Sequence, residues 1–217
     1  MEQSKDRSGR GKAHKKRFSG FTAQQALEKL QVDRLIPWPI EAKPYEPSPF
    51  LAERLRRLEN FDLSFSERSR ELVIDAFCEE VIDRHRDLKI WKAAPLESDD
   101  AIGQADYLVA PRKAYLTTPL LCVIEAKKDD FEQGLAQCLV EMDACAWVNQ
   151  RAGLTIDSYG IVTNGETWKF YRLTTNHEVF ETLPYALGDR DRVLSILDQI
   201  FSACQDLLHQ TSAQRSS

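Results

Sequence analysis

The sequence predicts a mixed α/β protein in which helices cover the faces of a central sheet. Apolar residues recur at helical spacing near residues 64–81, 131–146 and 191–208, which is typical of helices with one buried face. Runs rich in apolar and β-branched residues lie between these segments and indicate strands. Because the order is helix, three strands, helix, strands, helix, we expect helices packed on a mixed sheet.

Composition favours one globular domain with tails. The chain has 217 residues, of which 42% are hydrophobic and 29% are charged, as in ordinary soluble domains. No apolar run approaches the roughly 20 residues that span a bilayer, and the first 20 residues lack the apolar stretch of a secretory signal. The five cysteines are odd in number and form no CxxC pair. They indicate reduced thiols in a cytoplasmic protein, and a zinc cluster is not expected.

The charge of the chain is unevenly distributed. The net charge is −5, yet residues 1–20 hold seven lysines and arginines against Glu2 and Asp6, which gives this segment +5 and leaves −10 for the rest. A basic arm before an acidic body is a common means of contacting a polyanion. A solvated, disordered tail is the alternative interpretation.

The segment after the arm predicts a short helix and a connector. Residues 21–36 carry a helical pattern, and five prolines between Pro37 and Pro49 exclude a helix or central strand and favour an extended connector. We therefore divide the chain into a basic disordered arm (1–20), a helix with connector (21–63), a compact domain (64–210) and a disordered tail (211–217).

The first long helix is expected to begin after Ser64. The sequence "SFSE" fits a capping box with Ser64 as N-cap and Glu67 three residues on. One face of this helix is apolar through Leu72, Val73, Ala76, Phe77 and Val81. Glu80 falls inside that stripe, where a carboxylate is unusual. It either bonds a neighbouring residue or points at an active site.

The following elements alternate between strands and helices. Three strands are expected at 88–96, 105–111 and 119–128, and the third is the near-continuous apolar run of a central, two-sided strand. Asp129 or Asp130 can cap the next helix, which is apolar at positions from Phe131 to Ala146. The stretch "YGIVTNGETWKFYRL" predicts a hairpin about Asn164-Gly165. "HEVFETL" suggests a further strand, and residues 191–208 form an amphipathic closing helix.

Charged residues end the third strand, where burial would be expected to continue. Glu125 and Lys127 lie two residues apart and therefore share a face, and Asp106 begins the preceding strand. If these strands form a hairpin, Asp106 and Glu125 come close together. Two carboxylates and the carbonyl of Ala126 make an oxygen site suited to Mg²⁺. Lys127 adds a cation that can hold an attacking water or stabilise charge on a phosphate.

The arrangement resembles the PD-(D/E)XK nuclease superfamily over roughly residues 64–180. Four features carry the resemblance: "DY" at Asp106, "EAK" at Glu125–Lys127, the pair Gln133 and Gln137 in the next helix, and the "IVTNG" hairpin. It is most similar to the N-terminal nuclease domains of type I restriction motor subunits. Two features depart from the family pattern: Ala105 stands where many members have proline, and the body of the chain is acidic.

The resemblance implies a restriction-endonuclease-like fold with an α-β-β-β-α-β core. It also implies metal binding by Asp106 and Glu125, a catalytic Lys127, and support from the helix of Gln133 and Gln137. The family's glutamate on the first helix would be Glu80, with Glu71 and Glu79 as competing positions.

Two functions from different classes follow from these expectations. The first is a Mg²⁺- or Mn²⁺-dependent, endonuclease-like hydrolase of phosphodiester bonds, of the restriction or repair type, with DNA as the expected nucleic acid. The second is a catalytically silent nucleic-acid-binding or assembly module, because a fold does not dictate a function. Nucleic acid is the expected partner in both, together with a second copy of the chain or a partner protein, and no membrane partner is expected.

Overall fold

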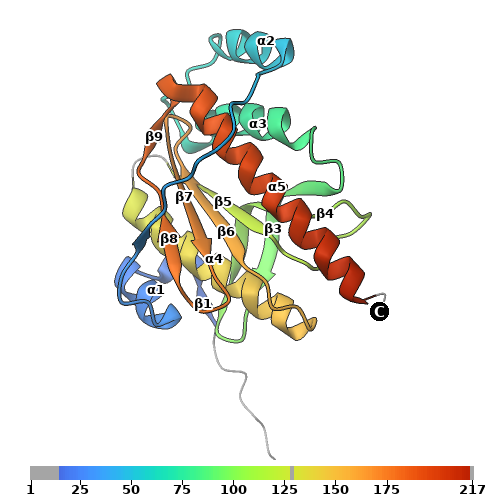
Figure 1. The fold of residues 1–217 in the computed structure, drawn as a ribbon. Coiled ribbons are helices and arrows are strands. Elements are labelled where there is room, and N and C mark those ends of the chain that lie inside the picture. Colours follow the sequence, from blue (N-terminus) through green and yellow to red (C-terminus); the bar gives the residue numbers. More distant parts are fainter. Residues whose placement is uncertain (1–14, 128–129, 216–217) are drawn as a thin grey trace, which may run out of the picture.

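A nine-stranded mixed sheet forms the centre of the computed structural model, which describes residues 15–127 and 130–215 (Figure 1). The strands are β1 (Lys16–Arg17), β2 (Ile36–Pro37), β3 (Leu88–Glu97), β4 (Ala101–Pro111), β5 (Cys122–Ala126), β6 (Ser158–Thr163), β7 (Thr167–Leu173), β8 (Val179–Glu181) and β9 (Tyr185–Ala186). Their order is β1-β4-β5-β6-β7-β8-β2, with β3 beside β4 and β9 beside β7. The predicted mixed sheet is confirmed.

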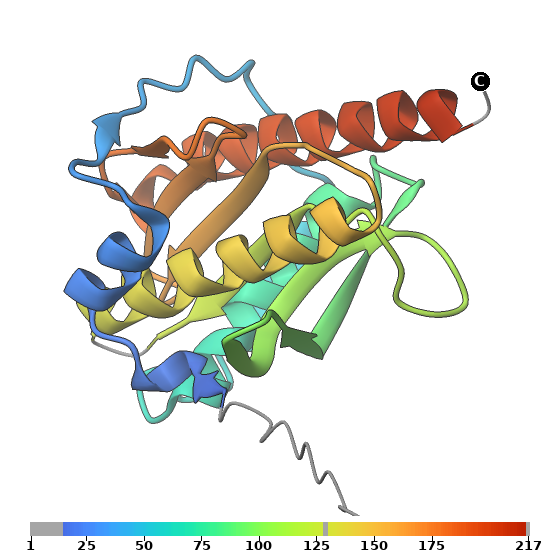
Figure 2. The same cartoon turned by 90° about the horizontal axis from the view of Figure 1, so that it is seen from below.

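Helices cover both faces of this sheet, as Figures 1 and 2 show. The helices are α1 (Ala23–Leu30), α2 (Pro49–Leu58), α3 (Glu67–Ile82), α4 (Phe131–Arg151) and α5 (Arg190–Arg215). A first core lies between the sheet and α3 with α5, and a second core lies between the sheet and α4 with α1. Because both faces are buried, the central strands are apolar on both sides.

The strand pairings bring the two predicted carboxylates onto one hairpin. β3 and β4 are antiparallel, and β4 pairs with β5 antiparallel through Tyr107↔Ile124. β5 and β6 are parallel and are connected through α4, as parallel neighbours require. The hairpin β6–β7 turns at Asn164-Gly165 as predicted, with Gly165 at φ 82°, which glycine adopts without a side-chain clash.

The side-chain alternation of β3 and β4 reverses in the middle of both strands. Leu88 on β3 packs in the first core, whereas Ala94, also an even-numbered residue, packs in the second. On β4, Tyr107 lies in the first core and Ala105 in the second. The change occurs at Ala93, whose φ of 49° is unusual for a residue with a side chain and which lies between the pairs Lys92↔Tyr107 and Ala94↔Ala105. Asp106 occupies the corresponding place on β4.

The N-terminal segments are more integrated than the predicted division of the chain. Residues 1–14 of the basic arm lie outside the described residues, but Lys16 and Arg17 form β1 against β4. α1 confirms the predicted short helix, and β2 adds Ile36 and Pro37 to the sheet beside β8. The extended connector follows β2 and leads into α2, a helix that the sequence pattern did not predict. It begins with Ser48 as N-cap and Pro49 at its first turn.

The boundaries of two predicted helices differ. α3 begins after Ser66, whose side chain accepts a hydrogen bond from Ser69 N, so the predicted N-cap Ser64 is wrong. Ser64 instead bonds Asp62 Oδ1 through its own N–H and hydroxyl. α5 continues to Arg215, so the described part of the predicted disordered tail is helical.

Composition also led to expectations about the protein interior and about membrane-spanning helices. All five cysteines are free and buried, as expected of core thiols. Trp168 and Phe170 are buried in the first core and Tyr171 in the second. Within the described part of the chain, no helix is both long enough and apolar enough to cross a membrane.

Candidate functional site

Asp106 and Glu125 lie together at the open end of the β4–β5 hairpin. Asp106 Oδ2 accepts a hydrogen bond of 2.9 Å from Ala126 N, so its carboxylate is fixed against the end of β5. Burial raises the pKa of Glu125 to about 7, and the charge of Asp106 is the next largest cause of this increase. The predicted proximity of the two carboxylates is therefore present in the structure.

Lys127 reaches into the same place from the residue after β5. Its Nζ lies 2.6 Å from Glu125 Oε1 and 3.9 Å from Glu67 Oε1 on α3. Burial lowers the pKa of Lys127, but the carboxylates of Glu125, Glu67 and Asp106 together outweigh burial and the net pKa is raised. The ammonium is therefore charged and held at the site.

Gly134 permits α4 to approach the stem of Lys127. A Cβ at this position would lie 2.7 Å from Val162 Cγ1 and 3.0 Å from Lys127 Cγ, both too close for ordinary contact. Only a residue without a side chain allows this spacing between the helix and the end of β5. The first turn of α4 thus forms one wall of the site.

Glu141 is a site residue that the sequence interpretation missed. It is fully buried on α4, and its deprotonated carboxylate has no hydrogen-bond donor among the described residues. Burial raises the pKa of Glu141 well above its usual range, and neighbouring Glu125 raises it further. A proton retained by either group would bond the two carboxyls. The sequence pattern could have identified this residue, because Glu141 lies one helical turn beyond Gln137, inside the apolar stripe of its helix.

Among the described residues, the site contains more carboxyl groups than cations. Asp106, Glu125 and Glu141 are partly or fully buried, and Glu125 Oε2 also has no hydrogen-bond partner in the described part of the protein. Burial raises the pKa of Asp106, an effect that the Ala126 N–H and Lys127 only partly offset. Buried carboxylates without compensating cations are costly, so protons or a bound cation must balance these charges.

The structure places Glu80 away from these carboxylates. Glu80 Oε1 accepts a hydrogen bond of 2.7 Å from Ser48 N, and Oε2 accepts one of 2.6 Å from Ser48 Oγ. Tyr45 OH donates to Glu80 Oε1 at 3.3 Å. Two roles were predicted for Glu80, and its contacts agree with bonding to neighbouring residues. Through these bonds Glu80 holds the connector at the start of α2. The placement of the family's first-helix glutamate at Glu80 finds no support in this geometry.

Of the competing glutamates on α3, Glu71 is the one beside the site. Its charge raises the pKa of Asp106, and its Oε2 lies 3.0 Å from Lys92 Nζ. Glu79 instead pairs with Arg54 at 3.4 Å. Because Glu67 and Glu71 are four residues apart, α3 presents both toward the carboxylates from one flank.

The two predicted glutamines have different surroundings. Gln133 Nε2 donates to Ser19 O at 3.2 Å and to Phe21 O at 3.3 Å, so it holds the N-terminal segment. Gln137 is buried and lines a pocket of about 480 Å³ together with Arg17 and Gln104. Both glutamines lie on the side of α4 that carries Glu141, but their contacts serve the N-terminal segment and the pocket.

The donor set at the site fits a hard divalent cation with few protein ligands. No three His, Cys, Asp or Glu side chains in the described ranges are arranged to hold a metal by themselves. Mg²⁺ does not require such a cage, because it keeps several waters and commonly binds one or two carboxylates. Asp106, the unpartnered Oε2 of Glu125 and the adjacent backbone of Ala126 offer that smaller set. The ligand role of the Ala126 carbonyl stays a prediction.

Comparison with known proteins gives a partial similarity. No protein-family model matches the chain. Crinkler effector protein 5 from Phytophthora infestans is 34% identical over 86 residues, which cover 38% of this chain. The matched region covers 24% of that protein, so the similarity concerns about a quarter of its length.

Proposed function

We propose that the chain is a divalent-metal-dependent phosphodiesterase of the PD-(D/E)XK nuclease type, with a restriction-endonuclease-like fold, that hydrolyses nucleic acid and DNA in particular. The observation that carries this proposal is the charge imbalance at the end of the β4–β5 hairpin. Asp106, Glu125 and Glu141 lie around the ammonium of Lys127, and Glu125 Oε2 has no protein partner among the described residues. A divalent cation balances such a set.

Each residue has a distinct role in this proposal. Asp106 and Glu125, with the Ala126 carbonyl, would hold Mg²⁺ or Mn²⁺. The bound metal would act as a Lewis acid and lower the pKa of a water molecule. Lys127 has a flexible stem, so its ammonium can contact a phosphate oxygen placed beside the two carboxylates.

Glu141 and Glu71 would act through these residues. Glu141 lies behind Glu125, and a proton on Glu141 would orient the Glu125 carboxylate through a hydrogen bond. Glu71 adds negative charge beside Asp106 from the opposite helix. Glu71 would increase the preference of the site for a cation, whereas a protonated Glu141 adds no charge and would act by orienting Glu125.

The ion pair between Lys127 and Glu125 favours the second candidate, a nucleic-acid-binding or assembly module without turnover. At 2.6 Å, this pair engages the lysine that hydrolysis requires. A silent module would bind nucleic acid, and its melting temperature would be the same with and without Mg²⁺.

Calorimetric titration of Mg²⁺ or Mn²⁺ into the purified protein, followed by cleavage assays on single-stranded and duplex DNA and RNA, tests the proposal. Wild type should bind one ion and cleave, whereas Asp106→Asn and Glu125→Gln should lose both properties while remaining folded. Asp157→Asn is the matched control, because Asp157 is a partly buried carboxylate paired with Arg172. No binding to wild type at millimolar metal, with nucleic acid present, would exclude the nuclease function.

A further inference from the structure

The N-terminal strap, which we define as residues 15–21, forms one wall of the pocket beside the candidate site. It comprises β1 and a short 3-10 turn at Phe18–Gly20. The pocket has a volume of about 480 Å³, within the range of small-molecule sites. Its lining includes Arg17, Phe18, Ser19, Gly103, Gln104 and Gln137.

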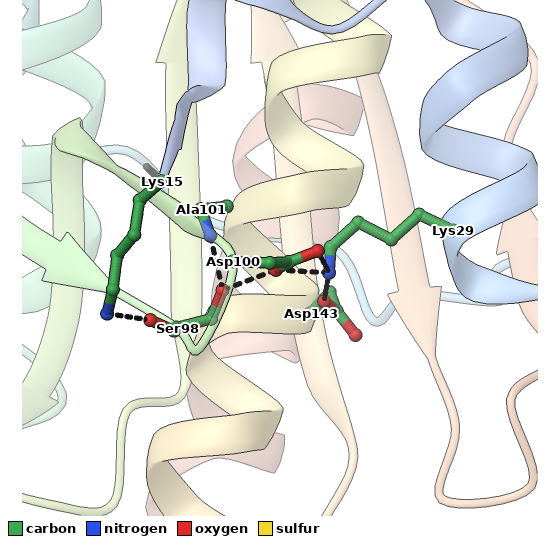
Figure 3. A network of polar contacts seen from close by, with 6 residues as sticks. All are labelled: Lys15, Lys29, Ser98, Asp100, Ala101 and Asp143. Atoms are coloured by element: carbon green, nitrogen blue, oxygen red, sulfur yellow. Dashed lines mark hydrogen bonds and ion pairs between the residues drawn. The ribbon is translucent and has the colours of Figure 1, made fainter. Parts of the chain in front are cut away.

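The strap is fixed at its first residues, so this wall of the pocket is preformed. Lys15 Nζ donates to Ser98 O, and Lys16 N donates to Asp100 O at 2.8 Å. Figure 3 shows how these contacts continue: Ser98 Oγ bonds Asp100, and Lys29 of α1 bridges Asp100 and Asp143 of α4. The strap, the β3–β4 turn and two helices are therefore tied together.

Two further contacts hold the other end of the strap. Gln133 of α4 donates to Ser19 O and Phe21 O. The buried ring of Phe18 packs on Gly103, where an added Cβ would lie 2.5 Å from Phe18 Cδ2. The strap thus lies directly on β4 at the floor of the pocket.

The pocket adjoins the carboxylates along one edge of β4. On this edge β4 pairs with β1 at Ala101 and Ile102 and with β5 at Tyr107–Val109. No pairing among the described strands covers 103–106 on this edge, so this unpaired stretch runs from the pocket residues Gly103 and Gln104 to Asp106. Gln104 precedes Asp106 by two residues, about 7 Å along a strand, and Gln137 precedes Glu141 by one helical turn.

The chemistry of the lining suits a nucleotide. The carboxamides of Gln104 and Gln137 can donate to and accept from the edge of a base, and Arg17 is the charged side chain among the described lining residues. Glutamine reads adenine through paired hydrogen bonds, and arginine binds phosphate. A base within a duplex is stacked and paired, so only an unpaired base can enter a pocket between the strap and β4.

We propose that this pocket binds one unpaired nucleotide of the substrate strand, next to the bond to be cleaved. Gln104 and Gln137 contact its base and Arg17 its phosphate. The inference rests on the proposed function and adds a substrate class to it: single strands, or duplexes with a frayed or flipped base.

Fluorescence anisotropy with a labelled 12-nucleotide DNA strand and a blunt hairpin duplex, measured in EDTA, tests the pocket without cleavage. Wild type should bind the single strand more tightly and should discriminate among dA, dC and dT homopolymers. Gln104→Leu should weaken single-strand binding about tenfold and reduce the discrimination. Arg17→Ala should weaken binding of every sequence to a similar extent.

The matched controls are Gln150→Leu and Arg86→Ala, which change exposed residues away from the pocket. Thermal melting checks that all variants are folded. The inference is overturned if wild type binds the duplex at least as tightly as the strand, or if Gln104→Leu and Arg17→Ala behave like the controls. Metal binding is measured in a separate titration, so that the pocket and the nuclease function are tested independently. Cleavage with unaffected variants would reject only the pocket, and pocket-dependent binding without metal binding would reject only the nuclease.

Discussion

Lys127 Nζ lies 2.6 Å from Glu125 Oε1, while Oε2 of the same carboxylate has no hydrogen-bond partner among the described residues. A structural ion pair at the end of a buried strand would be expected to satisfy both oxygens, because unpaired buried oxygens are costly. Here the charge of Asp106 raises the pKa of Glu125, whereas the Glu141 carboxyl lowers it through a hydrogen bond. Asp106 and Glu125 together carry more negative charge than Lys127 balances, so the pair leaves room for a further cation.

The first prediction concerns the pH dependence of stability without metal. The pKa of Glu125 is raised to about 7 in the folded protein, from an ordinary value near 4.5. A raised folded pKa contributes stability that is complete below about pH 4.5 and is lost as pH rises through about 7. In EDTA, wild type should therefore lose about 1 to 3 kcal/mol more than Glu125→Gln between pH 5 and pH 8. Calorimetric melting measures the difference, and parallel curves would contradict it.

The second prediction separates the roles of the lysine and the carboxylates. Lys127→Ala removes the cation that competes for Glu125 but leaves the oxygen ligands, so metal affinity should be kept or increased. Turnover should fall by about 10²- to 10³-fold, because the ammonium no longer contacts the phosphate. Metal titration and single-turnover cleavage measure the two effects.

Lys169→Ala is the control for this variant. Lys169 is similarly accessible and also pairs with a carboxylate, Glu181, at 2.7 Å. Loss of metal binding in Lys127→Ala, or an equal loss of turnover in Lys169→Ala, would show that the lysine is structural.

The third prediction distinguishes the glutamates of α3. Glu80→Gln weakens the hydrogen bonds to Ser48 and should cost about 1 to 3 kcal/mol of stability without changing metal affinity. Glu71→Gln should have a small effect on stability and should weaken metal binding, because it removes negative charge beside Asp106. Thermal melting and metal titration of the two variants give opposite patterns. If Glu80→Gln weakened metal binding and Glu71→Gln did not, Glu80 would be the first-helix glutamate that supports the site, as the sequence predicted.

Periodicity predicted the main elements because most of them bury a regular face. The strands at 88–96 and 105–111, the hairpin about Asn164 and the closing helix all follow such patterns, and the structure contains them. β1 and β2 have two residues each, too short for any period. Their positions depend on partners far along the chain, β4 and β8.

The site could be predicted where it depends on neighbours along one strand. Glu125 and Lys127 are two residues apart, and a hairpin sufficed to bring Asp106 to them. The roles of Glu80 and Glu141 could not be distinguished from the sequence, because both are carboxylates in apolar stripes of helices. Glu80 meets Ser48 of the connector, whereas Glu141 meets Glu125. Only the packing of each helix decides which partner a buried carboxylate finds.

The last prediction concerns Ala93, where the alternation of β3 and β4 reverses opposite Asp106. Its φ of 49° is a left-handed conformation, which costs a residue with a Cβ about 1 to 2 kcal/mol. Glycine avoids this cost but loses more conformational entropy on folding, so Ala93→Gly should leave stability unchanged or increase it by up to about 1 kcal/mol. Ala94→Gly, in ordinary buried strand, should lower stability by about 1 kcal/mol.

A β-branched residue tests the link between this backbone conformation and the site. Ala93→Val should be destabilising, because valine tolerates positive φ poorly. If the reversal positions Asp106, the valine variant should also bind Mg²⁺ more weakly than Ala93→Gly does. Chemical denaturation and metal titration of the three variants provide the comparison. Equal losses of stability for glycine at 93 and 94 would show that Ala93 is not left-handed in solution, and the reversal would then have another cause.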